Sequence, residues 1–266
     1  MANKIIFSIY ILIAILFFIK YIIYKKDMAF AKKIQDIFTK DGDPEKALVE
    51  LDNKIRKSSS CRINFYLLDK YFALIWLGQW QDAKLTASKI NLKKIGVERK
   101  YRYEYFSLLL KFLSEEFEDI DSVYHRFITS GTYNHIGEKT LSNNIFYILY
   151  MLYIKKDYIN VIEELNKIIN NANIHIIYLG LFYYCYAISK LNLGETLEAE
   201  KYFAKAMVFG EKTFIKEKAE NYLKQIKKGY QDSIITNDEI DRIISEAYEE
   251  RTKRIQEITI KMEKGK

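Results

Sequence analysis

The pattern of apolar and polar positions divides the chain into an apolar N-terminal segment and a long amphipathic remainder. Residues 5–24 read IIFSIYILIAILFFIKYIIY, twenty positions with one charge and no glycine or proline. Because an α-helix needs about 20 mostly apolar residues to cross a bilayer, this segment predicts a transmembrane helix. A cleaved signal peptide is the alternative, since Ala29-Phe30-Ala31 has the small-x-small form of a cleavage site. The charged residues between the apolar run and Ala31 favour retention of the helix.

Basic residues are distributed unevenly around this segment. Lys4 precedes it, whereas five lysines lie near or beyond its other end: Lys20, Lys25, Lys26, Lys32 and Lys33. Flanks rich in lysine and arginine stay in the cytosol. We therefore expect a single-pass membrane protein with its N-terminus outside, its C-terminal domain cytoplasmic, and lipid contacts through the N-terminal helix.

Behind this segment one frame recurs every 36 to 41 residues. A turn residue is followed five positions later by a small or β-branched residue, and then by apolar residues at helical spacing. The small or β-branched residue is found at Ala47, Ala83, Ile120, Val161 and Ala199. The turn residue is Gly42, Gly78, Glu115, Lys156 and Gly194 in the same order. With a single proline and no alternating valine-rich run, the frame predicts an all-α protein built from helix pairs.

The frame resembles the tetratricopeptide repeat, a 34-residue helix-turn-helix unit with LG, Tyr, Ala and Phe at set offsets. The resemblance covers about residues 29–228 and is clearest in LNLGETLEAEKYFAKA, which holds Gly194, Ala199 and Phe203. It implies an α-solenoid of about five helix pairs whose first helices line a concave ligand-binding face. We thus expect an anchor at 1–28, a solenoid at 29–229, and a loop with a charged amphipathic helix at 230–266.

The first helices of the pairs are apolar nearly all round, so a second apolar face remains after each has packed on its partner. We call this face the aromatic stripe. Its members are Phe65, Leu68, Phe72, Trp76, Tyr105, Phe112, Phe146, Tyr150, Tyr153, Tyr184 and Ile188. Three arrangements would cover the stripe: a solenoid closed on itself, the protein's own C-terminal helix, or a partner's apolar helix or extended peptide.

A second candidate surface is basic, and we call it the basic patch. It consists of Lys84, Lys89, Lys93, Lys94, Arg99, Lys100 and Arg102, opposed only by Glu98. A solvated helix end is one interpretation, and binding to an anionic membrane leaflet or an acidic partner is the other. Nucleic acid is not expected, because no stacking platform or recognised nucleic-acid module accompanies the charge.

Catalytic chemistry has no support in the sequence. His125, His135 and His175 match no metal-ligand spacing, and no phosphate loop or hydrolase motif occurs. Cys61 and Cys185 fall in helical segments and predict buried free thiols. We expect no enzyme, cofactor, metal or small-molecule substrate. The expected function is a membrane-anchored protein-interaction scaffold or adaptor, and the alternative is a sensor held shut by its C-terminal helix until a peptide displaces it.

Overall fold

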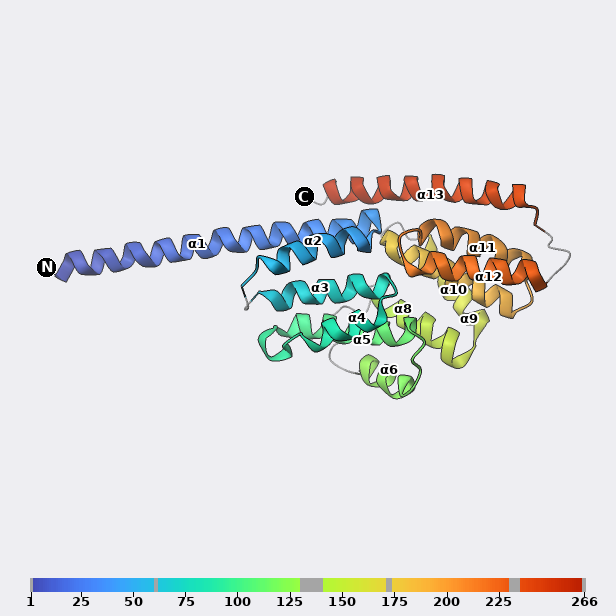
Figure 1. Cartoon of the computed structure of the whole chain (residues 1–266), viewed down its shortest axis with the longest axis horizontal. Helices are drawn as coiled ribbons and strands as arrows, with labels where there is room; N and C mark the ends of the chain where they lie inside the picture. Colours follow the sequence, from blue (N-terminus) through green and yellow to red (C-terminus); the bar gives the residue numbers. More distant parts are fainter. Residues whose placement is uncertain (1, 60–61, 130–140, 171–173, 230–234, 265–266) are drawn as a thin grey trace. The chain divides into compact units, whose positions relative to one another are not determined.

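The computed structural model describes residues 2–59, 62–129, 141–170, 174–229 and 235–264. Every regular element within these ranges is helical, which confirms the expected all-α class. The chain forms two compact units, Met1–Asp36 and Ile37–Lys266. Figure 1 labels the helices of both.

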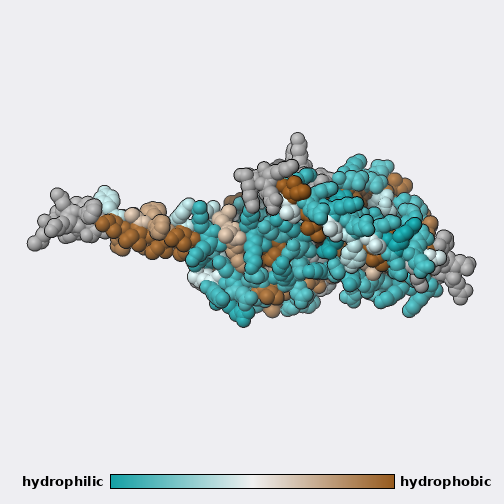
Figure 2. All heavy atoms as spheres, turned by 90° about the horizontal axis from the view of Figure 1, so that it is seen from above, coloured by the Kyte–Doolittle hydropathy of each residue, from teal (hydrophilic) through white to brown (hydrophobic). Residues whose placement is uncertain are grey.

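The first unit is one helix, α1 (Ala2–Asp36). Its side chains from Tyr10 to Tyr24 are largely apolar and exposed, and Figure 2 shows this surface in brown. Among the helices that the structure describes, none combines the length and the apolar character needed to cross a membrane. From Tyr10 onward, Lys20 interrupts the apolar run and Lys25 and Lys26 end it. The predicted transmembrane anchor is therefore wrong, and so are the single-pass topology and the membrane location that depended on that anchor.

The second unit is a series of helices joined mostly by short turns. Its elements are η1 (Ile37–Asp41, a π-helical turn), α2 (Pro44–Arg56), α3 (Ile63–Trp76), α4 (Trp80–Ser88), η2 (Leu92–Lys94, a 3₁₀ turn), α5 (Val97–Leu113), α6 (Ile120–Thr129), α8 (Leu141–Tyr150), η3 (Met151–Lys155, a π-helical turn), α9 (Tyr158–Ile169), α10 (Ile176–Asn192), α11 (Thr196–Phe209), α12 (Phe214–Gly229) and α13 (Asn237–Lys264). Of the roughly five expected pairs, four lie within the described part of this unit, as α3 with α4, α5 with α6, α8 and η3 with α9, and α10 with α11. Tetratricopeptide identity stays a prediction.

The turns of the pairs follow the recurring frame residue by residue. All five predicted turn residues adopt a left-handed backbone, with φ of 57° at Gly42, 71° at Gly78, 60° at Glu115, 54° at Lys156 and 80° at Gly194. Glycine adopts this conformation without a Cβ clash, whereas other residues lose about 1 kcal/mol or more. The same turn therefore forms in every copy, including the two that lack glycine.

Side-chain caps mark where α2, α9 and α13 begin. The Asp43 carboxylate accepts a hydrogen bond from the Lys46 backbone N–H at 2.9 Å, and Asp157 accepts one from Asn160 at 3.3 Å. Thr236 accepts a hydrogen bond from the Glu239 N–H at 3.2 Å at the start of α13. Each cap satisfies an N–H that the first helical turn leaves without an intrahelical acceptor.

The array of pairs closes on itself around α10. Thirteen residues of α10 are buried, and the helix meets elements far away in the sequence. The Trp76 ring of α3 lies 5.2 Å from the Tyr178 ring of α10 in an edge contact. The Tyr105 hydroxyl of α5 lies 3.4 Å from the Tyr178 hydroxyl. Since α10 is apolar all round, it must be covered all round, and helices from the early pairs provide part of that cover.

The last two helices complete the unit. α12 packs against α11 and α10, and Phe214 at its start contacts the Trp80 ring at 5.0 Å. α13 packs mainly on α11. Its Glu250 carboxylate accepts hydrogen bonds from the Tyr183 hydroxyl at 2.7 Å and from the Lys205 ammonium at 3.1 Å.

Candidate functional site

The aromatic stripe forms part of the protein's core. Its buried members are Leu68, Phe72, Trp76, Tyr105, Phe112, Phe146, Tyr150, Tyr184 and Ile188. Phe65 and Tyr153 are half-buried. Members from different pairs meet directly, as in the Tyr105 and Phe146 rings, whose centroids are 4.7 Å apart. This packing corresponds to the closed solenoid among the three arrangements. A partner-binding role for these residues stays a prediction.

Burial explains the acid–base state of the stripe's phenols. Loss of water contact raises the pKa of Tyr105 and Tyr184 well above the usual value, and it raises the pKa of Tyr178, which meets Tyr105, to about 12. These hydroxyls stay protonated at physiological pH. They act as hydrogen-bonding core groups.

Tyr150 is the stripe member with a polar end at the surface. Its hydroxyl donates to Asp121 Oδ1 at 2.5 Å and lies 3.4 Å from His125 Nε2. This hydrogen bond, with smaller contributions from His125 and Lys155, lowers the pKa of the exposed Asp121 carboxyl below its usual range. The ring itself stacks on Tyr124 at 4.1 Å. The sequence did not predict this cluster, because its members lie on three elements, α6, α8 and η3.

The basic patch separates into paired and unpaired cations. Lys84 donates to Glu116 at 2.5 Å and Arg102 donates to Asp69 at 2.6 Å. The Arg99 guanidinium lies over the Phe65 ring, 3.8 Å from its centroid. The exposed cations without a side-chain partner among the residues that the structure describes are Lys89, Lys93, Lys94 and Lys100.

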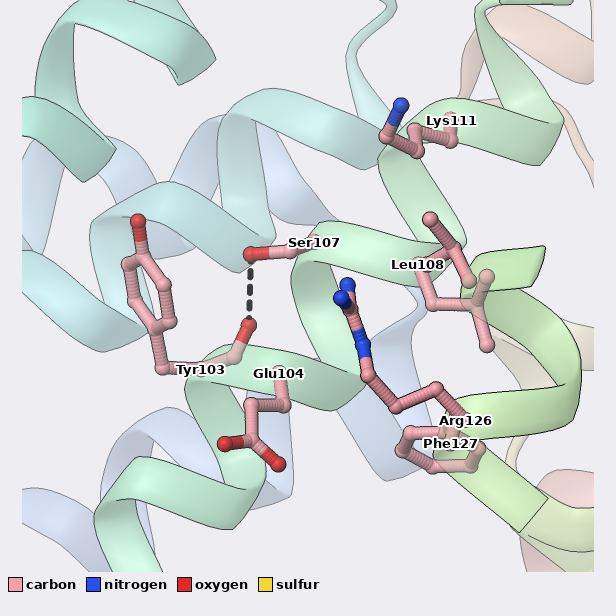
Figure 3. A pocket seen from close by; sticks show the side chains of 8 residues that line it. Tyr103, Glu104, Ser107, Leu108, Lys111, Arg126 and Phe127 are labelled. Atoms are coloured by element: carbon pink, nitrogen blue, oxygen red, sulfur yellow. Dashed lines mark hydrogen bonds between the residues drawn. The ribbon is translucent and has the colours of Figure 1, made fainter. Parts of the chain in front are cut away.

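A cavity of about 480 Å³ lies between α5 and α6, where the sequence predicted no site (Figure 3). We call it the α5–α6 groove. Its lining is Tyr103, Glu104, Ser107, Leu108 and Lys111 from α5, with Val123, Arg126 and Phe127 from α6. The α5 members are spaced one helical turn apart and so share one face of that helix. The groove is within the size range of ordinary ligand pockets.

The groove has an apolar base and a polar rim. Leu108 and Phe127 are buried, while Glu104 and Arg126 are exposed. Figure 3 shows the Arg126 guanidinium pointing from α6 back toward the α5 wall and Ser107. That guanidinium has no partner among the described residues. An apolar side chain would fit the base, and an acidic group beside it would meet Arg126.

Ser107 belongs to the structure of the groove wall. The Ser107 hydroxyl donates to the Tyr103 carbonyl at 2.8 Å, and it accepts a hydrogen bond from the Tyr71 hydroxyl at 3.5 Å. Across the described ranges, no three His, Cys, Asp or Glu side chains gather closely enough to hold a metal ion. The groove therefore combines a concave surface, apolar side chains at its base and the charged Arg126 at its rim, as ligand-binding sites do.

Comparison with protein-family models, characterised proteins and solved structures yields no match to this chain.

Proposed function

We propose that this protein is a non-catalytic interaction scaffold that binds a segment of a partner protein in the α5–α6 groove. The observation that carries the proposal is an open groove between two helices that has an apolar base and a polar rim, with the Arg126 guanidinium unpaired within the part of the chain that the structure describes. Leu108 and Phe127 provide the contact area and Arg126 provides the polarity. The expected ligand is a short peptide segment with an apolar side chain next to an acidic residue.

The burial of the aromatic stripe supports this choice of surface. A partner that used the stripe would have to separate α3 and α5 from α10, and the rings between them are in direct contact. Each buried aromatic or aliphatic side chain stabilises the closed form by roughly 1.5 to 3 kcal/mol. A surface groove needs no such opening.

The position of α13 bears on the sensor alternative. That alternative requires α13 to cover the partner's surface. In this fold α13 is attached through Glu250 to Tyr183 and Lys205, and through Arg251 to Glu211 at 3.1 Å. Residues of α13 are not among those that line the α5–α6 groove. We therefore propose a scaffold whose groove is accessible in the resting state.

The test begins with a displayed library of random peptides panned against the full chain. Selected peptides are synthesised and titrated by fluorescence anisotropy. Val123→Trp fills the groove without adding charge, and Arg126→Glu reverses the charge of its rim. Each variant should weaken binding about tenfold, which corresponds to about 1.4 kcal/mol.

Lys224→Glu is the matched control, because Lys224 is an exposed lysine of α12 without a partner among the described residues. It makes the same charge change as Arg126→Glu and should leave the affinity unchanged. Circular dichroism confirms that each variant is folded. Peptides that bind folded Val123→Trp as tightly as the wild type would rule out the groove as the binding site.

A further inference from the structure

The connection between α4 and α5 holds exposed aliphatic side chains among unpaired lysines. We call this surface the basic edge, defined by Lys89, Lys93, Lys94 and Lys100 together with Leu92 and Val97. Leu92 is 39% exposed and Val97 is 61% exposed. Between residues 89 and 100 the single carboxylate is Glu98. Exposed aliphatic groups and a local excess of positive charge therefore occupy the same short segment.

The segment is held in a fixed conformation. Ile90 and Ile95, on either side of the η2 turn, are buried. The Asn91 N–H donates to the buried Asn64 side chain at 2.9 Å, and the Asn91 carboxamide accepts from the Lys93 N–H at 3.0 Å. With its ends pinned, the turn presents Leu92 and the lysines outward. Because the segment is already ordered, it loses little conformational entropy when it binds a surface.

The neighbouring cations Lys84 and Arg102 form ion pairs, whereas the lysines of the basic edge form none with the residues that the structure describes. Lys84 pairs with Glu116 and Arg102 pairs with Asp69, so their charges are used within the protein. The four lysines of the basic edge have no side-chain partner among the described residues. Ammonium groups on flexible stems suit diffuse attraction to a charged surface better than oriented recognition of one carboxylate.

We propose that the basic edge binds the surface of an anionic lipid bilayer. The lysines lie at the head groups, and Leu92 and Val97 enter the boundary between head groups and acyl chains. Charge and aliphatic insertion act together at such surfaces, and neither alone gives stable binding. This contact lies on the face of the helical array and requires no segment that crosses the membrane. It is independent of the partner proposed for the α5–α6 groove.

The test places an environment-sensitive nitrobenzoxadiazole dye at the basic edge of the full chain. Val97→Cys is labelled in a Cys61→Ser background, and vesicles of phosphatidylcholine with 30% phosphatidylserine are added. The dye should become at least twice as bright and shift to the blue. Vesicles of phosphatidylcholine alone should produce little change, and 0.5 M salt should reverse the response.

Two matched controls locate the effect. Ile159→Cys on α9 carries the same dye at a position that is also 61% exposed, and it should not respond. Lys93→Gln with Lys94→Gln should raise the lipid concentration at half-response about fivefold or more. Lys224→Gln with Lys253→Gln removes the same charge from exposed lysines elsewhere and should leave it unchanged.

Other outcomes would overturn the proposal. An equal response at residue 159, or an equal response to uncharged vesicles, would mean that another part of the chain binds lipid. A response to polyglutamate but not to phosphatidylserine vesicles would assign the basic edge to an acidic polypeptide. Loss of peptide binding to the α5–α6 groove would leave this result unaffected, so the two proposals fail separately.

Discussion

Replacement of Gly180 by alanine tests a close main-chain contact between α10 and the end of α11. A Cβ atom at Gly180 of α10 would lie 2.7 Å from the Gly210 nitrogen and 2.8 Å from the Gly210 Cα, at the end of α11. Real Cβ contacts are almost never shorter than 3.0 Å. Both obstructing atoms belong to the main chain, so no side-chain rotation relieves the contact.

Two opposing effects determine the magnitude. Alanine in a helix interior is favoured over glycine by about 1 kcal/mol. Overpacking in a tight core costs about 1 to 3 kcal/mol, and the rigid main chain of α11 favours the upper part of that range. The net expectation is a loss of about 1 to 2 kcal/mol in the free energy of unfolding. For a unit of this size, that corresponds to a fall of about 2 to 8 °C in Tm.

Urea unfolding followed by circular dichroism measures the change. Gly96→Ala is the control, because no atom lies within 4 Å of a Cβ built at Gly96. Gly96 is the residue before α5, so the control alters only a helix cap and should cost about 0.5 kcal/mol. A Gly180→Ala protein as stable as the wild type would show that α10 and the end of α11 do not approach this closely, which would contradict the packing described for this pair.

Three further changes address ionisable groups that are buried or half-buried. Burial raises the pKa of Glu200, which is 1% exposed. The free energy of unfolding of the protein is therefore highest at low pH, where Glu200 is neutral, and falls as pH rises toward the raised pKa. Glu200→Gln should remove this fall, and its urea midpoint should exceed that of the wild type by more at pH 8 than at pH 4; parallel profiles would contradict the burial. Burial raises the pKa of Cys185 to about 12, so in Cys61→Ser protein a thiol reagent should label it only as fast as the chain unfolds, and rapid labelling of folded protein would refute this. Glu250→Ala removes the acceptor of two hydrogen bonds and should cost about 2 kcal/mol, whereas exposed Glu249→Ala should cost almost nothing in the same urea assay.

The local features of the fold could be predicted from the sequence because each depends on neighbouring residues. The recurring turn is the best example, since Gly42, Gly78 and Gly194 mark it and the apolar spacing around Glu115 and Lys156 identifies the other two copies. The cap at Thr236 and the start of α13 follow from the same kind of signal. Such features need no knowledge of which helices meet across the molecule.

Closure of the array was one of three arrangements that the sequence left open, because it depends on the angle between each helix pair and the next. The contact of Trp76 with Tyr178 joins two elements that the repeat frame alone leaves far apart. The α5–α6 groove was missed for a related reason. Tyr103, Ser107 and Lys111 read as an ordinary helix face, and only the separation of α6 from that face leaves a cavity there.

The α5–α6 groove and the basic edge both include residues of α5, so the length of helix between them sets the distance that separates the two surfaces. Lys100 lies in the first turns of α5 and Ser107 lies seven residues further along, which corresponds to about 10 Å at 1.5 Å per residue. One apolar side chain buried in the α5–α6 groove contributes roughly 1.5 to 3 kcal/mol, too little for tight binding of a partner. A bilayer held at the basic edge would bring head groups within about 10 Å of that partner. A partner that also contacts lipid would therefore gain from the effective concentration that this short distance creates, so weak recognition in the groove would suffice when both surfaces are occupied.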